Sequence, residues 1–388
     1  MNKLIWGITL ALISLCFACD GADVCTAEYP PQYIVYKLRD GEKIDLDGKL
    51  TEGAWNVPEM GPLVDLAGGA MGPEPYRKTR TVMRYDDECL YVGAVLEEPQ
   101  AWANHSEENT PIFQDNDYEV FVDAGGEFHH YKELEISATN VRWNLLMVRP
   151  YVNGGPAVCN TTVPNLCSAT DPAHGVFSTY DIRRTWRTAT SVDGAVNDPV
   201  RGSRSWSLEM CIPIKDMLVY SHAEAPRHNT FWHANVMRVQ WHVHTEHRPD
   251  GTAYYAKDAK PCDNWAWAPT GAVNVHLPDK WGFLQFSEDA PGRTAPLANP
   301  SFPLRRVLTK IYEAEHNYAE IHGGAFTENL DQLVTESGFD RDLLACVMRN
   351  SLVIGTRPGE FAAKATSLDG TLLGAITHDR QFTLTVNK

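Results

Sequence analysis

A mixture of acidic and aromatic side chains fills residues 113–123, which read FQDNDYEVFVD. Successive side chains of an extended strand point to opposite faces, so Val120 and Val122 share one face and are expected to pack a core. The other face carries Phe113, Asp115, Asp117, Glu119, Phe121 and Asp123. Aromatic rings stack on the apolar faces of sugars, and carboxylates bind hydroxyls or hard cations. The segment therefore predicts a face that binds a polyol or a cation.

The aspartates of this segment suggest calcium as a cofactor. Asp115, Asp117 and Asp123 supply carboxylate oxygens, the ligands that Ca²⁺ prefers, and they are the candidate metal ligands. An edge strand whose acids protect it from aggregation has the same composition. The sequence leaves both interpretations open.

Paired carboxylates also raise the question of catalysis. Glu119, Glu133 and Glu135 lie on neighbouring predicted strands, and a glycosidase holds two carboxyls at a defined separation across the scissile bond. The sequence does not fix that separation, and no hydrolase domain is recognisable. We therefore expect binding without catalysis, so the chain is not assigned as an enzyme. Hydrolysis of O-glycosyl compounds stays an alternative function.

The elements that must position these side chains are short strands. Strand formers bounded by turn residues recur between residues 80 and 286, with few long helical patterns among them. This pattern predicts a mainly β fold, an antiparallel β-sandwich, over residues 26–290. Residues 291–303 have the composition of a linker. Helical spacing begins at Leu304, so residues 304–388 are expected to form a small α+β C-terminal unit.

The N-terminus has the pattern of an export signal. Lys3 precedes an apolar run from Leu4 to Ala18 that is too short to span a bilayer comfortably and ends in small residues. We expect residues 1–22 to be a signal peptide and the protein to be secreted. Cys19 is a candidate for a lipid anchor if the source is bacterial, although Cys16 stands where such sites usually carry a leucine. No other segment is expected to span a membrane.

Charge and cysteine content describe the environment of the chain. A net charge of −16 argues against nucleic acid as a partner, because phosphates require a basic surface. The nine cysteines fit export, and Cys159 and Cys167, which bracket a short loop, are the best candidate disulfide. Asn104 and Asn160 begin glycosylation sequons, which matter in a eukaryotic secretory route.

Four separated segments carry a resemblance to a known family. They read IDLDGKLTEGAWNVPEM, DDECLYVGAVLEEP, FQDNDYEVFVD and VNVHLPDKWGFLQFS. Their order and spacing resemble family 9 carbohydrate-binding modules, over about residues 33–287. The chain looks most like the secreted, stand-alone members that have a C-terminal extension. The resemblance implies a β-sandwich related to the DOMON superfamily. It also implies non-catalytic binding of a polysaccharide or oligosaccharide in carbohydrate catabolism, alongside glycoside hydrolases.

The resemblance also assigns roles to particular positions. The family glutamate that bonds sugar hydroxyls corresponds to Glu119, and the first ring of the aromatic clamp corresponds to Phe113. The second ring falls at Val275, which is not aromatic. The family arginine falls near Glu135, and Arg238 on a later strand is the candidate to replace its charge.

Tryptophans in predicted loops are the remaining candidate ligands. Trp102, Trp265 and Trp267 lie in segments that contain proline or asparagine and are therefore expected to be exposed. Together with Phe113, Glu119, Glu135 and Arg238, they complete the predicted sugar site.

A different class of function remains open, a haem-binding electron-transfer module of the DOMON type. Such a module needs axial ligands on facing strands, and Met147, Met237, His242 and His244 are available. No haem signature selects among these residues.

Overall fold

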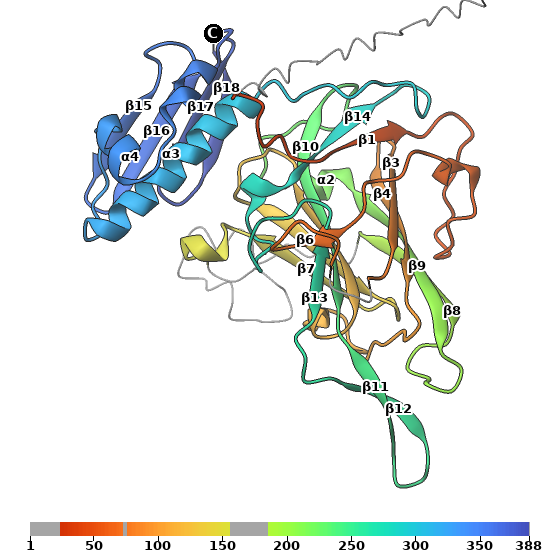
Figure 1. The fold of residues 1–388 in the computed structure, drawn as a ribbon. Helices are drawn as coiled ribbons and strands as arrows, with labels where there is room; N and C mark the ends of the chain where they lie inside the picture. Colours follow the sequence, from red (N-terminus) through yellow and green to blue (C-terminus); the bar gives the residue numbers. More distant parts are fainter. Residues whose placement is uncertain (1–23, 73–75, 156–184, 388) are drawn as a thin grey trace, which may run out of the picture.

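The computed structural model describes residues 24–72, 76–155 and 185–387 (Figure 1). The predicted signal peptide, Cys159, Cys167 and Asn160 lie outside the described residues. Within them the chain is mainly β, which confirms the predicted fold class. None of the described helices is long and apolar enough to cross a bilayer.

The strands of the large N-terminal part begin early in the described chain. They are β1 (Gln32–Lys37), β2 (Val64–Asp65), β3 (Thr79–Tyr85), β4 (Cys89–Glu97), β5 (Asp117–Asp123), β6 (Tyr131–Ser137), β7 (Arg142–Met147), β8 (Arg187–Gly194), β9 (Ser203–Pro213), β10 (Phe231–Gln240), β11 (Val243–His247), β12 (Ala253–Lys257), β13 (Asp263–Ala266) and β14 (Gly282–Ser287). The helical turns between them are short. They are Gly53–Trp55, Ile112–Gln114, Tyr151–Asn153, α2 (Ile214–Met217) and Pro278–Lys280.

Most of these strands belong to one curled sheet of twelve strands. Its order is β7-β6-β5-β10-β14-β1-β3-β4-β9-β8, with β13 and β2 attached beside β10. The β5–β10 half packs against the β3–β9 half, and side chains of both halves meet in one core. The hydroxyls of Thr81 on β3 and Tyr118 on β5 are 2.9 Å apart across that core. The pairing is antiparallel except at β1, which runs parallel to both β14 and β3.

The first resembling segment, IDLDGKLTEGAW, folds around one buried carboxylate. Glu209 on β9 accepts a hydrogen bond of 2.8 Å from the indole of Trp55. Its other oxygen accepts the backbone N–H groups of Asp47 and Gly48, at 2.9 and 2.8 Å. Gly48 has a φ of +82°, and a Cβ there would overlap the backbone of Thr190. The glycine is therefore required by both the turn and the close approach to β8.

The C-terminal unit is a helix packed on a four-stranded antiparallel sheet. Its elements are α3 (Phe302–Ile321), α4 (Leu330–Glu336), the turn Arg341–Cys346, β15 (Val353–Arg357), β16 (Glu360–Thr366), β17 (Leu372–Thr377) and β18 (Phe382–Val386). Apolar residues of α3, including Leu308 and Ile311, pack against Ala363, Ile376 and Phe382 of the sheet. This α+β unit lies beside the sandwich, as the blue part of Figure 1 shows.

Several bonds join the C-terminal unit to the sandwich. The disulfide Cys25–Cys346 links the start of the described chain to this unit. Arg305 of α3 donates to the carbonyl of Gly126 in the β5–β6 connection. In the segment predicted as a linker, the Leu297 N–H donates to Gln285 on β14 over 3.0 Å. Residues 291–303 are therefore bonded to the sandwich, and α3 already begins at Phe302.

Candidate functional site

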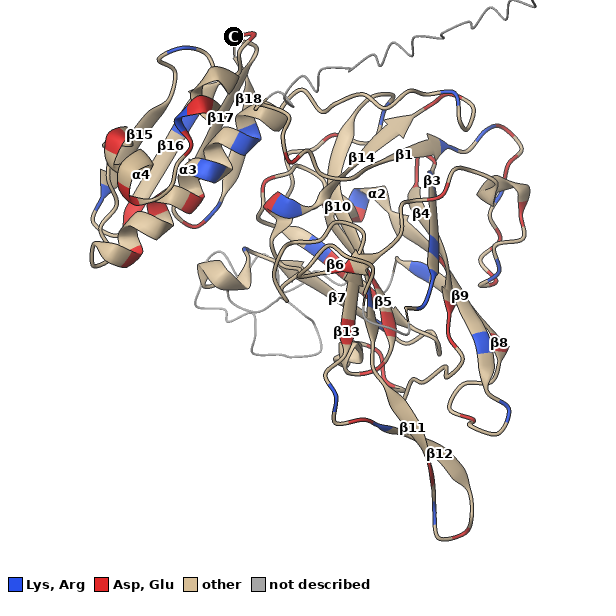
Figure 2. Cartoon of the chain, in the orientation of Figure 1, with Lys and Arg blue, Asp and Glu red and all other residues tan. Residues whose placement is uncertain are grey.

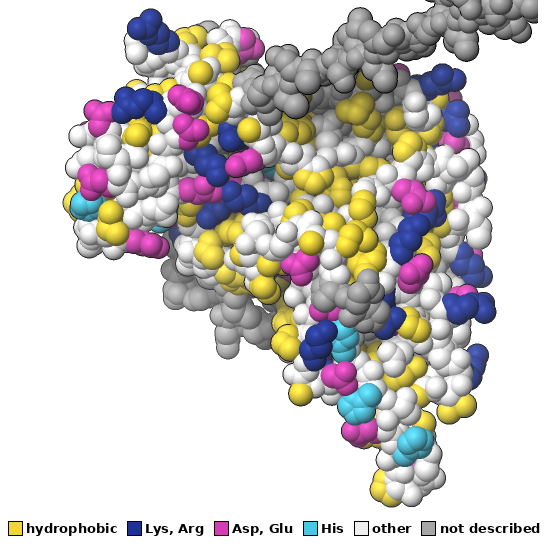
Figure 3. Space-filling model, viewed as in Figure 1, with side chains coloured by type: hydrophobic (Ala, Val, Ile, Leu, Met, Phe, Trp, Pro, Cys, Tyr) yellow, Lys and Arg dark blue, Asp and Glu magenta, His cyan; other side chains and the backbone are white. Residues whose placement is uncertain are grey.

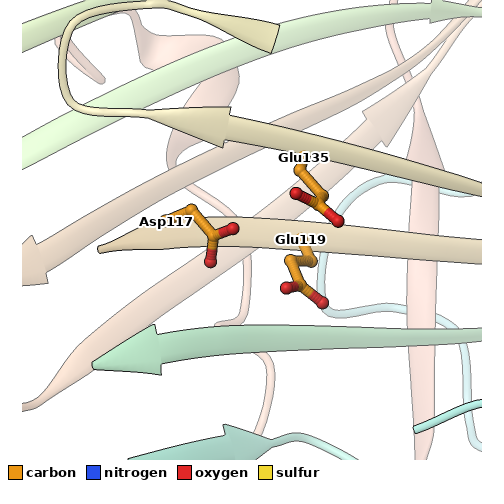
Figure 4. A group of neighbouring side chains, drawn as sticks. All are labelled: Asp117, Glu119 and Glu135. Atoms are coloured by element: carbon orange, nitrogen blue, oxygen red, sulfur yellow. The ribbon is translucent and has the colours of Figure 1, made fainter. Parts of the chain in front are cut away.

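A row of carboxyl groups crosses the face of β5 and β6 that points away from the main core. The antiparallel register places Glu119 directly opposite Glu135 and Phe121 opposite Glu133. Asp117 lies two residues before Glu119 on the same face. Figure 4 shows Asp117, Glu119 and Glu135 together on one side of these neighbouring strands. The alternation predicted from FQDNDYEVFVD thus holds within β5, whereas Phe113 lies in the short 3₁₀ turn before it.

The carboxyls of this row are buried. Glu119 is only 2% exposed, and Asp117, Glu133 and Glu135 are buried as well. Burial raises the pKa of Asp117, Glu119 and Glu135 well above the usual value, and the neighbouring carboxyls raise it further. Burial raises the pKa of Glu133 to about 7. The row therefore resists carrying its full negative charge.

The oxygens of the row are poorly satisfied. Neither carboxyl oxygen of Asp117 makes a hydrogen bond of normal geometry. Glu119, Glu133 and Glu135 each have one buried carboxyl oxygen that also lacks such a bond. Carboxylate oxygens of Asp117, Glu119 and Glu135 lie within 4.8 Å of one another. Among the described residues, these three acids form a group that could hold a metal ion.

Aromatic rings border one end of this row and are open to solvent. Phe113 is 42% exposed, and its ring centroid lies 5.5 Å from that of the partly exposed Trp143. Trp143 is paired with Glu135 across β7 and β6, so the rings lie beside the carboxyls. The indole of Trp241 donates to the Phe113 carbonyl over 2.8 Å, and the Lys257 ammonium lies 3.2 Å from the centroid of a Trp241 ring. We call Phe113, Trp143 and Trp241 the ring group.

The other end of the row contacts a histidine. The Tyr131 hydroxyl lies 3.0 Å from Nδ1 of His276, and Nε2 of His276 lies 4.0 Å from Glu133. Burial lowers the pKa of His276 to about 4, so the imidazole is neutral at pH 7. Exposed Tyr151 packs edge-on against His276, with centroids 4.6 Å apart. Val275, the position of the second clamp ring, is buried in the hydrophobic cluster that also contains Tyr131.

Arg238 does not join the carboxyl row. It is paired with Tyr118 rather than with Glu119, so its side chain lies on the opposite face of the sheet. There its guanidinium donates to Glu98 over 3.0 Å and lies 5.6 Å from a Trp265 ring centroid. The expectation that Arg238 supplies a positive charge next to Glu119 is therefore wrong. β10 carries no other Lys or Arg that could supply it.

The three loop tryptophans of the predicted site are buried. Trp265 lies in β13 and packs in the main core, and Trp267 packs in that core just after the strand. Trp102 packs against Val243 and Tyr255. Loop composition predicted exposure, but all three indoles are buried in hydrophobic clusters. They do not join the ring group.

The remaining aspartates of the predicted calcium site serve turns. Asp115 accepts the backbone N–H groups of Asn104 and His105 at 2.5 and 2.8 Å. Asp123 accepts those of Glu127 and Phe128 at 3.1 and 2.7 Å. Only Asp117 of the predicted trio belongs to the group of close carboxyls. The sequon residue Asn104 is exposed.

The histidines named as candidate haem ligands are paired with acids. His242 contacts Asp263 at 2.8 Å, and His244 contacts Asp258 at 2.5 Å. Histidines and acids gather along the β11–β12 hairpin at the lower end of Figure 3. Met147 and Met237 lie on one face of one sheet, separated by β5 and β6. The two methionines therefore do not face each other across an iron.

Sequence reasoning missed Trp143, Trp241 and Tyr151 as open rings. Trp143 shares one face of β7 with Leu145 and Met147, and the register between β7 and β6 places that face on the side of the carboxyls. Trp241 follows the end of β10, where the alternation of the strand no longer gives the direction of its side chain.

Basic and acidic residues are interspersed along the ribbon in Figure 2.

Comparisons with known proteins give matches among solved structures. No family model matches the chain, and no curated protein matches it. Two similar structures are family 9 carbohydrate-binding modules from Caldicellulosiruptor kristjanssonii. The complex with cellotriose is 13% identical, covering 69% of this chain and all of that one, with a TM-score of 0.39. The complex with glucose is 12% identical, covering 68% of this chain and all of that one, with a TM-score of 0.39. A candidate carbohydrate-binding protein from Bacteroides uniformis is 16% identical, covering 66% of this chain and 99% of that one, with a TM-score of 0.43.

Proposed function

We propose that the protein binds a polysaccharide or oligosaccharide on the ring group. The observation that carries this proposal is the pair of neighbouring rings, Phe113 and Trp143, open to solvent at the edge of a carboxyl-bearing sheet face. A pyranose presents an apolar C–H face that stacks on such rings, and its hydroxyls need polar partners beside them. The sequence resemblance to family 9 modules supports the same function.

The rings and the carboxyls have different roles in this proposal. Phe113 and Trp143 are accessible, so they make the first contact with the sugar. Glu119 and Glu135 lie deeper on the same face and give the surface beneath the rings its polarity. Lys257 and the Trp241 indole close the edge of the group on the β12 side.

Binding fits the geometry better than hydrolysis does. A general acid must reach the glycosidic oxygen, and a nucleophile or base must lie across the bond from it. Glu119 and Glu135 are neighbours on adjacent strands, and both are closed to solvent. The two carboxyls therefore do not flank a space that a glycosidic bond could enter.

We further propose that the protein works outside the cell, alongside glycoside hydrolases. The described cysteines support export, because Cys25–Cys346 and Cys89–Cys211 are disulfides, which persist in oxidising compartments. Finding the mature chain in the culture medium, rather than inside the cell, would test its location.

The sugar proposal is tested by glycan-array screening of the full chain, followed by isothermal titration with the best ligand. Phe113→Ala and Trp143→Ala should each weaken binding by about tenfold or more, because a stacking surface is removed. Tyr254→Ala, which removes a ring from the β11–β12 hairpin, is the matched control and should bind normally. Unchanged affinity in both ring variants, or no glycan bound at all, would refute the proposal.

A further inference from the structure

We propose that Asp117, Glu119 and Glu135 form a binding site for Ca²⁺. The inference does not rest on sugar binding, since the site lies in the buried carboxyl row rather than on the exposed rings. Oxygens of the three acids lie within 4.8 Å of one another. Ligands on opposite sides of a Ca²⁺ ion, each at about 2.3–2.6 Å, are separated by about this distance. The spacing is therefore that of one coordination sphere.

The charge balance of the row calls for a cation. Asp117, Glu119 and Glu135 are buried together, and the fourth acid, Glu133, is buried beside them. Among the described residues no Lys or Arg forms an ion pair with any of the four within 4.0 Å. The nearby imidazole of His276 is neutral at pH 7. Buried carboxylates without a partner are costly, and a divalent ion would compensate them directly.

A second observation concerns hydrogen bonding rather than charge. Both oxygens of the fully buried Asp117 lack a hydrogen bond of normal geometry. One oxygen each of Glu119 and Glu135 is in the same state, and Figure 4 shows these side chains on one side of the sheet. Buried acceptors are normally satisfied. One ion at the centre of the group would satisfy acceptors from all three residues.

The ligand set selects the kind of ion. All three donors are carboxylates, which favour a hard cation over the softer metals that prefer imidazole or thiolate. Carboxylates bind Ca²⁺ through one or two oxygens in a flexible geometry, whereas Mg²⁺ demands a near-ideal octahedron and keeps several waters. The carboxylate oxygens are closed to solvent. Ca²⁺ therefore fits this site better than Mg²⁺, which keeps several waters.

The test uses the full chain, freed of metal with a chelator, and CaCl₂ as the probe. Isothermal titration should show one tight Ca²⁺ per chain, and the unfolding temperature should rise with Ca²⁺ and less with Mg²⁺. Glu119→Gln and Glu135→Gln should lower Ca²⁺ affinity by about tenfold or more, because each removes one ligand charge. Asp87→Asn, at an acid whose side chain is 87% exposed, is the control and should bind as the wild type does.

The glutamine variants carry their own check on folding. Without metal, each removes repulsion within the row, so each should unfold at the wild-type temperature or above. Failure of Ca²⁺ to bind or stabilise the wild type would overturn the proposal, and so would unchanged Ca²⁺ affinity in both variants.

Ca²⁺ binding and sugar binding fail separately in these experiments. Phe113→Ala should lose sugar binding and keep Ca²⁺ binding, because its ring is not a ligand. Loss of Ca²⁺ binding in Glu135→Gln with no change in Phe113→Ala would locate the ion in the carboxyl row.

Discussion

Glu119 and Arg238 lie on neighbouring strands, β5 and β10, but on opposite faces of the sheet. Glu119 belongs to the carboxyl row, whereas Arg238 forms a buried ion pair with Glu98. The two residues therefore belong to different parts of the molecule. Arg238 holds the sandwich together, and the ring group and carboxyl row lie on the other side of the same sheet.

Arg238→Met should destabilise the fold without altering the sugar site. Removing one partner of a buried pair leaves Glu98 uncompensated, at a cost of about 3–5 kcal/mol. Urea unfolding measures this loss, and Arg204→Met, in the exposed pair with Asp193, should change stability by less than about 1 kcal/mol. A drop in glycan affinity with unchanged stability would contradict this prediction and would mean that Arg238 takes part in sugar binding.

Glu133→Gln should change the pH dependence of stability in the metal-free protein. Because burial raises the pKa of Glu133 from 4.5 to about 7, the folded state binds its proton more tightly than the unfolded state. This contribution is present at low pH and is lost as the pH rises from 4.5 through 7. As the pH rises from about 5 to about 8, the free energy of unfolding of the variant should therefore increase relative to that of the wild type by up to about 3 kcal/mol. Denaturant unfolding of both proteins at the two pH values measures the difference, and a constant difference would contradict the assignment.

Gly48→Ala should destabilise the sandwich by more than about 1 kcal/mol. The new Cβ would overlap the backbone of Thr190, and the left-handed φ of +82° is unfavourable for alanine. Gly41 has a similar φ of +86° but open space around it. Gly41→Ala therefore measures the cost of backbone strain without the steric overlap. Thermal unfolding should show the larger loss at Gly48, and equal losses would mean that backbone strain alone matters.

Arg380→Met should loosen the C-terminal unit from the sandwich. Arg380, in the β17–β18 turn, forms an ion pair with Asp279 of the sandwich, whose side chain is closed to solvent. Asp279 would then keep only its 3.6 Å pair with Lys280, so the loss should be measurable but smaller than the about 3–5 kcal/mol expected for a buried charge without any partner. Limited proteolysis within residues 291–301 should become faster. Lys310→Gln, in a partly exposed pair with Glu313, is the control and should be cleaved at the wild-type rate.

The mainly β fold and the acid-bearing face of β5 were predictable from the sequence. Side chains alternate with a fixed period of two, so Glu119 and Val120 must point to opposite faces once the strand forms. The same rule applied to Arg238 did not reveal its face, because the face depends on the register between β10 and β5. Pairing between strands distant in sequence is a tertiary property.

The buried tryptophans illustrate a second limit of the sequence. Trp265 and Trp267 lie among prolines and asparagines, which predicts loops, but β13 pairs with β10 and both indoles pack in the main core. The proposed calcium ligands were predictable only in part, because Glu135 comes from the next strand while Asp115 and Asp123 bond to nearby turns. Convergence of side chains from two strands requires the paired sheet.

The bond between Cys25 and Cys346 makes nearly the whole described chain a covalent loop. A protease that cuts once anywhere inside that loop would not release either fragment. Such a nicked molecule would keep its mass in a denaturing gel, and it would separate into two bands only after a reducing agent had been added.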